Sequence, residues 1–261
     1  MTVLGVLLRK ELLEIRRTWR IWVLPAIIMF IAVTSPILAE ITPGLVRSLA
    51  GSNPDVVIEL PDPVALDSYR QLASQLNQIG LLALIIASAG IVGSELRSGT
   101  AILVLTKPVS RRDFIVSKVL ANMALLIGAT IPAAIVCWLL TLAIFGEAPI
   151  GTLGAVIALW LVAAGGMLCL MMLLSTLIPA QAGAAGVGIA AYAVLSMLAL
   201  WGPARSWTPA GVLHGITAVI EETPSGIVGA IVATVVLSVV AVAVAIRHFD
   251  RSELAARERS T

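Results

Sequence analysis

The sequence predicts an all-α polytopic membrane protein with six transmembrane helices and a short amphipathic helix before the first of them. Of the 261 residues, 59% are hydrophobic and 12% are charged, whereas a soluble domain is about 25% charged. The apolar residues gather into six runs of about the length that crosses a bilayer. This composition excludes a soluble enzyme, and the net charge of +2 is too small to indicate a nucleic-acid partner.

Residues 1–20 are expected to form an amphipathic elbow helix at the membrane surface. Its apolar side chains share one helical face: Leu4, Leu7, Leu8, Leu12, Ile15, Trp19 and Trp22. Its charged side chains are expected to point away from that face: Arg9, Lys10, Glu14, Arg16, Arg17 and Arg20. Two interpretations stay open, namely a simple surface anchor and an elbow that also contacts a partner subunit.

Six spans are expected to follow the elbow. They cover residues 21–39, 79–94 (short unless 72–76 extend it), 119–145, 150–178, 182–201 and 226–246. Backbone groups in lipid must bond to one another, so these runs are helices. Pro25 and Pro36 interrupt the first.

The connections between the spans are unequal. A long acidic outer loop is expected over 40–78, and an outer segment with a short helix over 202–225. Tight turns are expected around Glu147 and at 179–181. A tail over 247–261 ends the chain.

Basic residues predict the orientation. Five precede the first span, five lie between the second and third, and four follow the sixth, whereas the opposite side has Arg47, Arg70 and Arg205. The excess of Lys and Arg on cytoplasmic loops places both termini in the cytoplasm, together with the segment 95–118.

The predicted spans lack the groups that intramembrane chemistry needs. None has Asp, Glu, Lys or Arg at its middle, which argues against an ion-coupled carrier. The P-loop pattern for ATP binding is absent. Cys137 and Cys169 lie in apolar runs, and His214 and His248 have no ligand neighbour at metal-binding spacing. We therefore expect no catalytic, cofactor or metal site and no enzyme activity in this chain alone, so that any work must be powered by another polypeptide.

The segment 95–118 has unusual local order for a loop. Gly99 and Thr100 can turn the chain before a short helix over 101–105, which Pro108 would end. Ser110 is expected to cap the next helix, with Asp113 three residues later. Two interpretations stay open: a basic loop that fixes topology, and a rigid projection that transmits a push.

This segment resembles the cytoplasmic coupling segment of ABC-2 type transporter permeases, the six-span membrane subunits of bacterial ATP-binding cassette exporters. The matching residues are Glu95, Ser98, Gly99, Thr100, Leu105, Pro108, Val109, Ser110, Arg111 and Lys118. The amphipathic helix, the six spans and the long segment between the fifth and sixth are also similar to that family.

The resemblance implies a permease in the bacterial plasma membrane that pairs with a second copy or a homologous permease. Separate nucleotide-binding ATPase subunits would carry ATP and Mg. The implied contacts with these subunits are Glu95, Arg97, Gly99, Thr100, Pro108, Arg111 and Arg112.

Small residues in the fifth span indicate a close helix contact. Ala182, Gly186 and Ala190 share a face, and Gly183 lies beside it. Gly183, Gly186 and Ala190 therefore either pack within the chain or form a dimer or path-lining helix. Uncharged spans suit an apolar or amphipathic cargo. Two other functions stay open as alternatives: a membrane-anchoring scaffold for a cytoplasmic partner, and a lipid-modifying enzyme, which would need a polar cluster at one membrane face.

Overall fold

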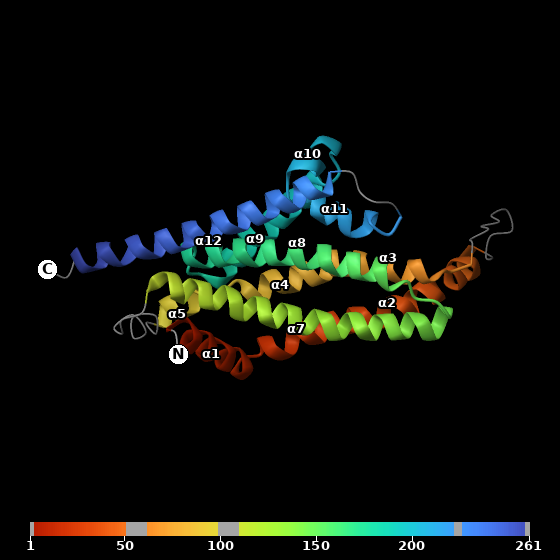
Figure 1. Ribbon diagram of the computed structural model, residues 1–261, viewed down its shortest axis with the longest axis horizontal. Helices are drawn as coiled ribbons and strands as arrows, with labels where there is room; N and C mark the ends of the chain where they lie inside the picture. The colour runs from red at the N-terminus through yellow and green to blue at the C-terminus, as the bar shows by residue number, and fades with distance from the viewer. Residues whose placement is uncertain (1–2, 51–61, 99–109, 222–225, 259–261) are drawn as a thin grey trace.

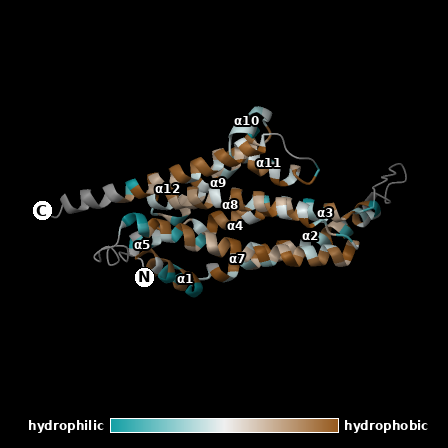
Figure 2. Cartoon of the chain, viewed as in Figure 1, coloured by the Kyte–Doolittle hydropathy of each residue, from teal (hydrophilic) through white to brown (hydrophobic). Residues whose placement is uncertain are grey.

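The computed structural model describes residues 3–50, 62–98, 110–221 and 226–258. Within these ranges every regular element is a helix, and six helices are long and apolar enough to cross a membrane. They are Ile21–Ser48, Ala65–Glu95, Arg111–Phe145, Ile150–Leu177, Gln181–Leu198 and Ile227–Phe249. Figure 2 shows hydrophobic residues along these helices and hydrophilic ones gathered mainly toward the ends. The predicted all-α polytopic membrane fold is confirmed.

The helices form an elongated bundle in which both termini lie at the same end (Figure 1). This termini end also holds α1 (Val3–Arg17), α5 (Gly93–Ser98) and the start of α7 (Arg111–Phe145). The α7–α8 hairpin lies at the opposite end. Gly146 ends α7 there in a left-handed conformation, with φ of 75°, which confirms the tight turn predicted around Glu147.

The centre of the bundle is α8 (Ile150–Leu177), which packs against α4, α7, α9, α11 and α12. Two-thirds of its apolar stretch is buried, whereas only 11% of α9 (Gln181–Leu198) and 17% of the span in α12 (Ile227–Glu258) are buried. The exposed faces of α9 and α12 are apolar, as expected for helices that face lipid.

The second span is much longer than the sequence indicated. It begins with α3 (Ala65–Gln75), passes through a π-helical turn at Leu76–Gly80 and continues as α4 (Leu81–Ser88) into α5. Ala65, Tyr69 and Leu72 recur at helical spacing and are buried, so this stretch packs against α2 (Arg20–Ala50). The π-turn carbonyls of Leu76 and Asn77 accept hydrogen bonds from other helices: Trp160 Nε1 at 3.1 Å and Tyr192 Oη at 2.7 Å.

The outer loop predicted over 40–78 is therefore wrong at both its ends. Residues up to Ala50 continue α2. Pro25, Pro36 and Pro43 all lie inside that helix and do not end it. Residues from Ala65 belong to the second span. Of the predicted loop, 51–61 lie outside the described residues.

The segment 202–225 contains α10 (Gly202–Trp207) and α11 (Ala210–Ala218). The predicted short helix is confirmed, with Val212 and Ile216 fully buried in contacts of α11 with α8 and α12. Residues 247–258 of the predicted tail continue α12 as helix, because no Gly or Pro interrupts the sequence there.

The elbow helix α1 packs against α7. Leu7, Glu11 and Ile15 form its buried stripe, so only part of the predicted apolar face is covered. Trp19 and Trp22, which follow α1, are largely exposed.

Candidate functional site

A buried lysine links three helices at the termini end. Lys118 of α7 is 1% exposed, and its Nζ lies 2.9 Å from Oε2 of Glu11 in α1 and 2.8 Å from Oε1 of Glu95 in α5. Both carboxylates are nearly buried as well. A buried ion pair costs desolvation, and removal of one partner leaves an uncompensated charge. These three side chains therefore fix the relative positions of α1, α5 and α7.

A second lysine completes this group, which we call the charge cluster (Lys10, Glu11, Glu14, Glu95 and Lys118). Nζ of Lys10 lies 2.9 Å from Oε1 of Glu11, 2.9 Å from Oε2 of Glu14 and 3.1 Å from Oε1 of Glu95. Burial by itself lowers the pKa of Lys10, but hydrogen bonds to Glu11 and Glu14 and the charges of Glu11 and Glu95 outweigh it. The pKa of Lys10 therefore lies above its ordinary value, and the ammonium stays charged.

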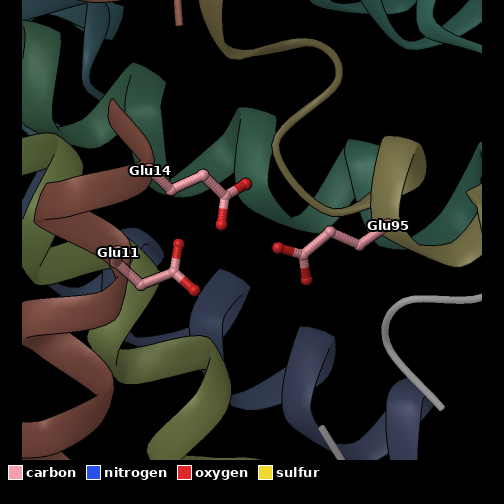
Figure 3. A group of neighbouring side chains, drawn as sticks. All are labelled: Glu11, Glu14 and Glu95. Carbon is pink, nitrogen blue, oxygen red and sulfur yellow. The ribbon is translucent and has the colours of Figure 1, made fainter. Parts of the chain in front are cut away.

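The three carboxylates of the cluster converge from two helices, as Figure 3 shows. Their ligand atoms lie within 4.8 Å of one another, a spacing that could suit a metal ion. Each carboxylate, however, already accepts a hydrogen bond or forms an ion pair with Lys10 or Lys118. The two ammonium groups supply the positive charge that a cation would bring, so the geometry favours an ion-pair network.

Aromatic rings extend the cluster to a fourth helix. Nζ of Lys118 lies 5.0 Å from the ring centroid of Phe114, one turn earlier on α7. That ring stacks on Phe249 of α12, with centroids 5.5 Å apart. A cation over an aromatic face is attracted to it, most strongly where water is excluded. The end of the sixth span is thereby packed against the same site.

The start of α5 is held from α8. Oγ of Ser175 accepts hydrogen bonds from the backbone N–H groups of Val92 and Gly93, each at 3.0 Å. A Cβ on Gly93 would lie 2.7 Å from the carbonyl oxygen of Pro179, so the α8–α9 turn approaches too closely for any other residue. These contacts set the position of α5 and thus of Glu95.

The structure places the predicted coupling residues unevenly. Glu95 lies inside the charge cluster, whereas Arg97 and Arg112 are exposed and Arg111 is half-buried. Gly99, Thr100 and Pro108, together with the predicted helix over 101–105, lie outside the described residues. The predicted cap is confirmed, because Oγ of Ser110 accepts a hydrogen bond of 3.1 Å from the backbone N–H of Asp113.

Sequence reasoning missed part of the site. Lys10 and Glu14 were expected to point away from the packed face of α1, but both join the cluster. The Lys10 side chain reaches Glu11 and Glu95 from a position beside the stripe, and Glu14 joins the cluster through Lys10. Glu11 itself carries a usable signal, since it lies four residues from both Leu7 and Ile15 and thus in the buried stripe.

The small residues of α9 divide between two faces. Ala184 and Gly188 are buried, and a Cβ on Gly188 would collide with Met171 of α8. Gly183, Gly186 and Ala190 are exposed in this chain, and a Cβ on Gly186 would meet nothing within 4 Å. The contact within the chain therefore uses Ala184 and Gly188, not the Gly186 face.

Two comparisons bear on the family. Residues 63–255 match the model of a family described as "Protein of unknown function (DUF2705)". The chain is also 29% identical over 119 residues to the "Uncharacterized transmembrane protein YxlG" of Bacillus subtilis (strain 168). That alignment covers 45% of this chain and 46% of the relative, so it spans about half the length of each. Because the family match covers well over half of the chain, the chain belongs to the DUF2705 family.

Proposed function

We propose that this chain is the permease subunit of an ATP-driven exporter of the ABC-2 type. The observation that carries the proposal is the charge cluster. It joins α1 to Glu95 and Lys118, which lie on either side of the segment 96–117. A force applied to that segment would reach the elbow helix and the second and third spans together, because a packed ion-pair network does not deform continuously.

The orientation follows from the basic residues. Arg9, Arg16 and Arg17 lie on α1, and Arg97 and Arg112 flank the segment, all at the termini end. The positive-inside rule supports a cytoplasmic position for this end in the bacterial plasma membrane. A nucleotide-binding subunit would dock there, and ATP and Mg would belong to that subunit.

Dimerisation and cargo are supported by the spans themselves. The exposed face with Ala182 and Gly186 offers a close helix contact for a second permease. The described membrane-spanning stretches carry no charged side chain at their middle, which favours an apolar or amphipathic cargo.

The test is reconstitution of the full chain with an ATP-binding cassette ATPase from the same organism. The complex is purified through a tag on this chain, the ATPase is identified by mass spectrometry, and ATP hydrolysis is measured in proteoliposomes. We expect a stable complex whose hydrolysis depends on this chain. Arg112→Glu should reduce ATPase recovery several-fold, whereas Arg17→Glu, an exposed change on α1, should not.

Two results would contradict the proposal. If no such ATPase associates while another cytoplasmic protein is retained, the chain is a membrane-anchoring scaffold. If Arg112→Glu and Arg17→Glu behave alike in recovery and in hydrolysis, the 95–118 segment is not the docking site.

A further inference from the structure

An apolar groove lies on the surface of the helix bundle between α9 and α12. Its volume is about 640 Å³, and α8 forms its floor. Val187 and Val194 line it from α9, and Leu237 and Val244 from α12. Pro209 and Leu213 lie at the end near α11. The groove therefore lies at the depth of the membrane-spanning helices and is separate from the charge cluster.

The groove is elongated along α12. The lining residues of α12 run from Thr234 to Val244, which spans about 15 Å at the rise of a helix. An acyl chain is flexible and apolar, so it can lie along a groove of this length against α8.

The chemistry of the walls also favours a hydrocarbon chain. The lining hydroxyls are those of Thr234 and Ser238. Thr234 donates to the carbonyl of Ala230 at 2.8 Å, and Ser238 donates to the carbonyl of Thr234 at 2.7 Å. Both hydroxyl protons are thus bonded within α12. The walls offer burial of apolar surface to a ligand, and little hydrogen bonding.

One end of the groove meets a positive charge. Arg247 follows Val244 by three residues on α12 and therefore lies one turn beyond it on the same side. The Arg247 side chain is exposed and forms no ion pair with any described residue. It lies two residues before the end of the span at Phe249, where a long basic side chain reaches the headgroup level.

We propose that this groove is a binding site for an anionic phospholipid, with an acyl chain along α8 and the phosphate group on Arg247. A guanidinium group binds a phosphate through paired hydrogen bonds. Attraction to an anionic headgroup adds to the apolar burial of the chain. This inference does not rest on the proposed function.

The experiment is photo-cross-linking of the full-length protein in nanodiscs of phosphatidylcholine. These contain a small fraction of phosphatidylglycerol that carries a diazirine in its acyl chain, and adducts are mapped by mass spectrometry. We expect adducts concentrated on the groove-lining residues of α9 and α12. Ala191→Phe, which fills the groove, should remove most of them, whereas Ala193→Phe on the exposed side of α9 should not.

The headgroup is tested separately on a variant that leaves the groove unchanged. Arg247→Gln should lower groove labelling by phosphatidylglycerol about fivefold, and should lower labelling by a matched phosphatidylcholine probe by less, because its choline cation offsets the phosphate charge. Arg17→Gln, another exposed arginine of the termini end, is the control and should have no effect on either probe.

Three outcomes would overturn the inference. Adducts spread evenly around the bundle, with Ala191→Phe equal to Ala193→Phe, would mean that the groove holds no lipid selectively. Equal labelling by both probes in the parent protein and in Arg247→Gln would show that Arg247 does not select an anionic headgroup. A photoreactive residue at Val194 that links to a second copy of the chain would show a protein occupant.

Discussion

Glu95 and Lys118, which bracket the segment 96–117, form a buried ion pair of 2.8 Å between Oε1 and Nζ. This ion pair joins α5 to α7 at the two ends of the segment. Because Glu11 of α1 binds the same ammonium, the elbow helix is part of this connection.

Replacement of Lys118 by Met should destabilise the protein strongly. Glu11 and Glu95 would keep only the partly exposed Lys10 in place of two cations, and removal of one partner of a buried pair costs up to about 3–5 kcal/mol. The measurement is the thermal unfolding midpoint in detergent, with Arg112→Met as the exposed control on α7. An additional Glu95→Gln change should recover part of the loss, and equal midpoints for Lys118→Met and Arg112→Met would show that the cluster carries no stability.

Replacement of Lys10 by Met should have a smaller effect that does not vary with pH between 6 and 9. The side chain of Lys10 is 38% exposed, so solvent screening limits its contribution to about 1 kcal/mol or less. The folded-state pKa of Lys10 is raised, so its stabilising effect is complete below the ordinary pKa of about 10.4 and is lost only as the pH rises through the folded value.

The unfolding midpoints of Lys10→Met and the parent protein, compared at pH 6.5 and pH 9, check this expectation. A difference that is present at pH 6.5 and absent at pH 9 would mean that Lys10 deprotonates in that interval and is not held by the three carboxylates.

Gly93→Ala should distort the junction between α5 and the α8–α9 turn. The added methyl group would approach the carbonyl oxygen of Pro179 to 2.7 Å, and backbone atoms must move to relieve that contact. We expect a lower unfolding midpoint and a loss of ATPase recovery in the complex. Gly128→Ala in α7 is the matched control, since a Cβ there meets nothing within 4 Å and alanine favours helix. If the two variants unfold at the same midpoint, the contact between residue 93 and Pro179 does not limit the side chain at position 93.

Two glycines of α9 should respond in opposite ways to Leu. Gly188→Leu should destabilise the protomer, because its side chain would collide with Met171. Gly186→Leu should keep the unfolding midpoint but convert a dimer to a monomer, as measured by light scattering in detergent. If the Gly186→Leu protein keeps the mass of the dimer in this measurement, the Gly186 face does not form the proposed dimer contact.

Local features of the fold could be predicted from the sequence, and contacts between distant segments could not. Ser110 caps α7 because the donor is only three residues away. The tight α7–α8 turn likewise depends on a short stretch that ends at Gly146. Lys118 and Glu11, by contrast, are 107 residues apart. Their contact depends on how α1 docks on α7, and no local pattern encodes that docking.

The second span shows a related limit. Arg70, Gln71 and Ser74 make the stretch before Ile79 look like a polar loop. Their apolar neighbours Tyr69, Leu72 and Ala73 nevertheless bury one face of a helix against α2. An amphipathic start to a buried span has low average hydropathy, so a search for continuous apolar runs places its beginning too late.

Site-specific photo-cross-linking in living cells tests the central claim most directly. A photoreactive amino acid is placed at Arg112, beside the segment 99–109, and in a second strain at Glu147 in the α7–α8 turn at the opposite end. If the segment receives force from a nucleotide-binding subunit, Arg112 captures a P-loop ATPase and Glu147 does not. Capture of such an ATPase from Glu147, or none from either position while the protein is folded in the membrane, would contradict the account.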